Sequence, residues 1–114
     1  MEYNKHTYVS IFHVFIVAPL LVYIGRSYGE LHEWMFNFLI LLSTGIFIHH
    51  GIKAYNRGIQ SGWFSLLHAV FFAPLLFYVG YARKETFIGV FPVISMLGFA
   101  ALGFHLMKLL QRPI

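Results

Sequence analysis

The chain contains 114 residues, 59% of them hydrophobic and only 11% charged, and its formal net charge is +4. Together with a mean hydropathy of +0.71, this composition excludes an ordinary soluble globular domain. The absence of cysteine excludes disulfides and thiolate metal ligands, so any bound metal must have nitrogen or oxygen ligands. We therefore expect an all-α integral membrane protein.

Four apolar stretches follow one another along the chain, with short polar breaks between them. They cover approximately residues 7–25, 34–55, 62–81 and 87–110. Each is close to the ~20 residues that a helix needs to cross ~30 Å of hydrocarbon, whereas the strands of a membrane barrel are ~10-residue segments of alternating polarity. We predict a single domain over residues 1–114 with four transmembrane helices.

Two prolines lie inside the first and third stretches. Pro19 and Pro74 lack the backbone N–H that would bond to the carbonyl four residues earlier, at Phe15 and Val70. We expect a bend at both places. Pro92, by contrast, lies near the start of the fourth stretch, where proline is tolerated.

The second half of the chain repeats the first at an offset of 55 residues without a gap. Between residues 8–55 and residues 63–110, 13 of the 48 aligned pairs are identical. The identical polar pairs are Ser10/Ser65, His13/His68, Tyr23/Tyr78, Glu30/Glu85, His50/His105 and Lys53/Lys108. Because polar residues are scarce in so apolar a chain, these matches predict a tandem duplication of a two-helix unit.

The duplication and the charges together predict an orientation. Each repeat has two helices, so both repeats enter the membrane from the same side, and we expect a pseudo-twofold axis along the membrane normal. The side with both termini carries Lys5, Lys53, Arg57, Lys108 and Arg112, and the other side carries Arg26, Arg83 and Lys84. The excess of basic residues predicts that both termini are cytoplasmic.

One histidine falls in each predicted helix at a similar distance from the cytoplasmic end. His13 lies about six residues into the first helix and His50 about five residues before the end of the second, which is roughly 9 Å of depth. Symmetry puts His68 and His105 at the same level. Because ionisable residues in a membrane span usually face the bundle interior and mark a function, we predict a layer of four histidines that bind a metal.

Further polar residues lie one helical turn nearer the cytoplasm. Ser10 precedes His13 by three residues and Lys53 follows His50 by three, so each shares a face with its histidine. Ser65 and Lys108 repeat this spacing in the second half. We predict that these four residues help to bind the cofactor, the lysines by neutralising anionic groups such as haem propionates.

The chemistry of four imidazoles narrows the choice of cofactor. Neutral imidazole is the commonest metal ligand among side chains, and without thiolates it suits Fe, Cu or Zn better than Mg or Ca. Haem b held by a histidine on each side is an equally good fit. The histidine arrangement resembles bis-histidine b-type cytochromes and the four-histidine iron site of photosynthetic reaction centres. This resemblance implies electron transfer, with a redox protein or a quinone as partner.

Two other functions fit the same residues. In a small transporter or channel the histidines would form a proton or ion relay, although the predicted spans contain no Asp or Glu for coupling. In an assembly or lipid-binding subunit they would only form hydrogen bonds between helices. Whether the protein is an enzyme stays open: no acid accompanies Ser10 and His13 as a catalytic triad requires, but a metal centre could react with oxygen or quinone.

The expected partners are the lipid bilayer and a second copy of the chain. The basic residues are scattered at helix ends and form no nucleic-acid motif, so nucleic acid is not an expected partner. His49 points about 100° away from His50 on the helix. We expect it to face lipid headgroups or a neighbouring subunit.

Overall fold

A computed structural model describes residues 5–111, and this part of the chain consists of helices joined by short loops, without a strand. The long apolar stretches account for this, since a segment suited to hydrocarbon must satisfy its backbone hydrogen bonds internally, as a helix does. In chain order the elements are α1 (Lys5–Phe12), the π-helix η1 (His13–Val17), α2 (Ala18–Ser27), α3 (Glu33–Leu67), the π-helix η2 (His68–Phe72), α4 (Ala73–Ala82), the 3₁₀-helix η3 (Arg83–Glu85) and α5 (Val90–Leu110).

Three helical segments in this part of the chain are long and apolar enough to cross a membrane: Thr7–Ser27, Glu33–Glu85 and Val90–Leu110. The first and third have 21 residues each, and the middle one has 53. Many large apolar side chains on these segments are exposed, for example Phe15, Leu41 and Met96 at 69–74%. Such faces are compatible with a lipid environment.

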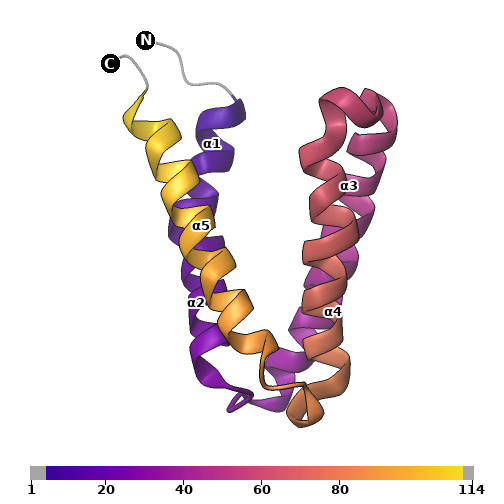
Figure 1. Cartoon of the computed structure of the whole chain (residues 1–114), viewed down its shortest axis with the longest axis vertical. Coiled ribbons are helices and arrows are strands. Elements are labelled where there is room, and N and C mark those ends of the chain that lie inside the picture. The colour runs from indigo at the N-terminus through magenta and orange to yellow at the C-terminus, as the bar shows by residue number, and fades with distance from the viewer. Residues whose placement is uncertain (1–4, 112–114) are drawn as a thin grey trace. The chain divides into compact units, whose positions relative to one another are not determined.

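The middle segment is interrupted at Gly58. This residue has φ 79° and ψ 171°, while its neighbours in α3 are helical. That backbone conformation is essentially restricted to glycine, and the chain reverses there, so the first part of α3 lies beside α4 (Figure 1). Gly58 falls inside the break that the sequence predicts between the second and third apolar stretches.

The chain divides into two compact units. Unit 1 consists of α1, η1, α2 and α5, and unit 2 consists of α3, η2, α4 and η3. Figure 1 shows the paired helices of each unit. In unit 1 the first predicted helix therefore packs on the fourth, and in unit 2 the second packs on the third.

Unit 1 is held together by a close approach between α2 and α5. A Cβ added at Gly25 would lie 2.5 Å from the Ser95 nitrogen and 2.7 Å from the Phe91 oxygen. One at Gly98 would lie 2.9 Å from the nitrogen of Val22. The helices touch through glycine, as is common at membrane helix interfaces.

Unit 2 has the corresponding contact between α3 and α4. A Cβ added at Gly80 would lie 2.7 Å from the oxygen of Phe36 and 3.0 Å from the nitrogen of Ile40. Each of these three residues lies 55 positions from its counterpart in unit 1. Tyr28 (φ 50°) and Arg83 (φ 54°), which are the non-glycine residues with positive φ in the described part of the chain, are separated by the same interval.

Arg83 links the end of α4 to the start of α3 in unit 2. It forms an ion pair of 2.7 Å with Glu33, a short hydrogen bond with the side chain of Asn37, and a cation–π contact at 5.7 Å with the ring of Phe36. The ion pair is partly exposed, so its contribution is modest.

We expect Arg83→Ala to lower the free energy of unfolding by about 1 kcal/mol, because several contacts between α3 and the end of α4 are lost together. SDS titration of the protein in mixed micelles measures this quantity. Lys84→Ala, which removes a neighbouring exposed cation, serves as the control and should change stability much less. Equal losses in both variants would contradict a specific role for Arg83.

Candidate functional site

The histidines of unit 1 form a stacked pair. The ring centres of His13 and His105 are 4.3 Å apart and their planes are inclined by 28°. His105, on α5, is buried, and its Nδ1 lies 3.2 Å from the hydroxyl of Ser10, within hydrogen-bond distance. His13 is half-buried at the start of η1. The unit thus brings together three of the residues that the sequence predicts as a site.

Unit 2 contains the equivalent pair. The ring centres of His50, on α3, and His68, at the start of η2, are 4.5 Å apart, with an interplanar angle of 26°. Both side chains are half-buried, and Ser65 is buried one turn before His68. The structure therefore places the four predicted ligands in two pairs, one in each unit; a single layer shared by all four stays a prediction.

A backbone hydrogen bond fixes the tautomer of one histidine in each pair. Nδ1 of His13 lies 2.7 Å from the carbonyl oxygen of Val9, and Nδ1 of His68 lies 2.8 Å from that of Phe64. A carbonyl only accepts, so Nδ1–H is the donor in both cases and the lone pair is on Nε2. Histidines that bind metals commonly have this arrangement, with the second ring nitrogen donating to a carbonyl.

Both of these histidines begin a π turn. The Ala18 N–H donates to the His13 carbonyl, and the Ala73 N–H donates to the His68 carbonyl, five residues back rather than four. Each π turn ends two residues before a proline, Pro19 or Pro74. The structure therefore has a π turn just before each proline at which the sequence predicts a bend, and π turns are frequent at functional sites.

The spacing within each pair limits how an ion could bind. A lone pair lies in the plane of its ring, and with metal–nitrogen bonds of about 2.0 Å, rings on opposite sides of an ion have centres about 6 Å apart. The observed rings face one another at 4.3 and 4.5 Å. The stacked rings of one pair thus do not enclose an ion between them, and a metal would approach the ring edge at Nε2.

Among residues 5–111, no group of three or more His, Cys, Asp or Glu side chains is arranged to hold a metal ion. The donor sets within the units are the two imidazole pairs. Their chemistry, neutral nitrogen without thiolate, fits first-row transition metals.

The two predicted lysines lie one turn beyond His50 and His105. Lys108 is exposed, and its Nζ lies 5.5 Å from the ring centre of Phe104. Lys53 is half-buried. Phe104 occupies the position that corresponds to His49 in unit 2, and the His49 ring is exposed and edge-on to that of His50 at 5.0 Å.

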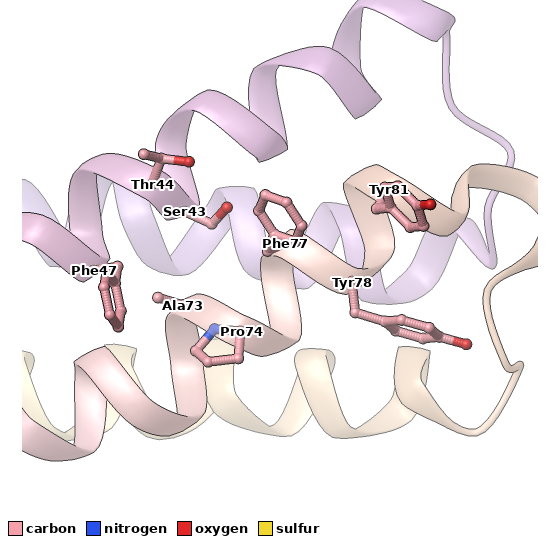
Figure 2. A pocket seen from close by; sticks show the side chains of 8 residues that line it. All are labelled: Ser43, Thr44, Phe47, Ala73, Pro74, Phe77, Tyr78 and Tyr81. Atoms are coloured by element: carbon pink, nitrogen blue, oxygen red, sulfur yellow. The ribbon is translucent and has the colours of Figure 1, made fainter.

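Unit 2 also contains a pocket of about 410 Å³ beside Pro74 (Figure 2). Its lining residues are Ser43, Thr44, Phe47, Ala73, Pro74, Phe77, Tyr78 and Tyr81. The hydroxyls of Ser43 and Thr44 both donate to the carbonyl of Ile40, so they are turned to their own helix and the wall is largely apolar. The sequence does not predict this pocket directly; the cluster of aromatic residues after Pro74 is the feature that could indicate it.

No protein-family model matches this chain, and comparison with curated proteins and with solved structures finds no similar one.

Proposed function

We propose that this chain is a multi-pass integral membrane protein that binds haem iron or a first-row transition-metal ion through His13, His50, His68 and His105, and that the bound metal transfers electrons. The observation that carries the proposal is the fixed tautomer of His13 and His68. In both units a backbone carbonyl accepts the Nδ1 proton and leaves the lone pair on Nε2, which is the donor that a metal requires.

We further propose that the 53-residue segment, reversed at Gly58, counts as two spans, so that four transmembrane helices arise from a duplicated two-helix unit. The glycine contacts, the positive-φ residues and the π turns recur at the same interval of 55 residues, which supports this view. With four spans both termini lie on one side, and the distribution of Lys and Arg favours the cytoplasmic side.

Within this proposal, His13 and His68 are the ligands whose orientation is best defined. His105 and His50 stack on them and limit their rotation. Iron or copper bound by imidazole nitrogen exchanges electrons without a change in the protein's covalent structure. Lys53 and Lys108, together with Ser10 and Ser65, would stabilise an anionic group of the cofactor.

Purification without an affinity tag tests the proposal directly. We expect the detergent-solubilised protein to have a Soret absorption band, or to retain iron or copper in stoichiometric amount by elemental analysis. Retention of zinc alone would support metal binding but contradict electron transfer, because Zn²⁺ has no redox chemistry. A colourless protein that contains no transition metal and does not bind Fe²⁺, Cu²⁺, Zn²⁺ or haem on addition would refute it.

A histidine relay is the second candidate function, and the contact between the Ser10 hydroxyl and Nδ1 of His105 favours it. Within unit 1, the Ser10 hydroxyl lies 3.2 Å from Nδ1 of His105, and the ring centre of His105 lies 4.3 Å from that of His13. Proton flux into liposomes that persists after metal removal and is lost in His13→Ala would support this function over metal binding.

A further inference from the structure

We infer that Pro19 and Pro74 are positioning residues: by enforcing a π turn, each proline rotates the histidine six residues before it toward the partner helix. This role rests on the proposed function, because the orientation of His13 and His68 serves metal binding only if the protein binds a metal. Its geometry is independent of any bound metal.

One face of the helix packs on the partner helix just after each π turn. Ala18 is 1% exposed, and its carbonyl oxygen lies against Gly98 of α5. Ala73 is 2% exposed in the corresponding position of unit 2. These alanines define the direction of the partner helix just after each π turn.

The π turn changes the direction of the histidine relative to that face. In an α-helix, five residues turn through about 500°, which would leave His13 roughly 140° away from Ala18. In a π turn the same five residues complete little more than one turn, so the angle falls to the order of 60°. His68 and Ala73 are related in the same way. The wider turn therefore brings each imidazole to the side of the partner helix, where it stacks on His105 or His50.

The proline is the cause of the π turn. A proline inside an α-helix lacks its N–H, and its ring clashes with the carbonyl four residues earlier. Both interior prolines follow a π turn. Pro92 is the third residue of α5, where the N–H has no partner within the helix, and α5 has no π turn. Pro92 is thus a matched control.

Cysteine cross-linking tests this inference in the full chain, which has no cysteine of its own. The variant His13→Cys/His105→Cys reports the contact before the π turn. Tyr28→Cys/Phe91→Cys reports a contact after it, between the residue that follows α2 and the start of α5, where the ring centres are 5.7 Å apart. Diamide is the oxidant, because copper reagents would bind the remaining histidines.

We expect Pro19→Ala to slow disulfide formation between positions 13 and 105 by about tenfold, since a disulfide requires Cα atoms closer than about 7 Å, and to leave the 28–91 reaction unchanged. Pro92→Ala should change neither rate. The pair His50→Cys/His68→Cys with Pro74→Ala repeats the test in unit 2.

An unchanged 13–105 rate in Pro19→Ala would overturn the inference. Loss of both the 13–105 and 28–91 reactions would also overturn it, because the proline would then support helix packing in general. These results do not depend on metal. If the cross-linking rates change as expected but the natural protein binds no metal or haem, the inference stands and the proposed function fails.

Discussion

Replacing both His13 and His68 by alanine is expected to weaken metal or haem binding by at least about 100-fold, which exceeds the 10- to 100-fold losses typical of residues that only orient a ligand. These two histidines have their Nδ1 protons bonded to the carbonyls of Val9 and Phe64, at 2.7 and 2.8 Å. Removing them takes away the Nε2 donors whose orientation is fixed. Titration with Cu²⁺, Zn²⁺ or hemin, followed by absorption or calorimetry, measures the loss.

The companion variant, His50→Ala with His105→Ala, should have a smaller but clear effect. These side chains stack on His13 and His68 at 4.3 and 4.5 Å, so their removal takes away two ligands and frees the rings of His13 and His68 to rotate, but it leaves the two Nε2 donors that the backbone carbonyls orient. His49→Ala is the control, because this histidine is exposed and has Phe104 as its counterpart in the repeat. If His49→Ala weakens binding as much as the double substitution of His13 and His68, the metal is bound elsewhere.

The helical character and the approximate positions of the apolar segments were predictable from the sequence. The pairing of histidines was predictable only in part. An offset of 55 residues makes His13 equivalent to His68 and His50 equivalent to His105, but equivalence does not determine which histidine contacts which. In the structure each ring stacks on one from the other half of the chain, because α2 packs on α5 and α4 packs on α3.

The glycines carry the signal for this pairing. Gly25 and Gly80 are identical in the alignment of the two halves, and each permits close contact with the residues around Phe91 or Phe36. Sequence periodicity alone does not say which helix approaches a given glycine. Contacts between residues far apart in the sequence determine which helices pack together, and the local sequence pattern does not predict these contacts.

The π turns were missed for a different reason. The predicted depth and orientation of the histidines assume the regular geometry of an α-helix. A π turn rotates the residues before it relative to the residues after it. A proline six residues after a histidine, present at both Pro19 and Pro74, is the sequence feature that could have indicated the departure. The π turns change which residues share a helix face with Ala18 and Ala73, and they therefore change the direction of the imidazoles of His13 and His68.

The glycine contacts lead to the second prediction. Gly25→Ala and Gly80→Ala are each expected to lower the free energy of unfolding by about 1–3 kcal/mol, the usual range for overpacking. The new methyl group would meet backbone atoms of the opposite helix, at 2.5–2.7 Å for Gly25 and from 2.7 Å for Gly80. Backbone cannot move aside as a flexible side chain can, so the helices must separate.

Gly45→Ala separates this effect from helix propensity. Gly45 lies in α3, and a Cβ there would meet nothing within 4 Å, so alanine should raise stability by up to about 1 kcal/mol through propensity alone. The same gain partly offsets the steric cost at Gly25 and Gly80, which makes any net loss there a lower bound on the cost of separating the helices. SDS titration in mixed micelles compares the three variants under one condition. Stabilisation by Gly25→Ala and Gly80→Ala equal to that of Gly45→Ala would mean that the helices do not meet at these glycines, and the histidine pairing that depends on this packing would lose its support.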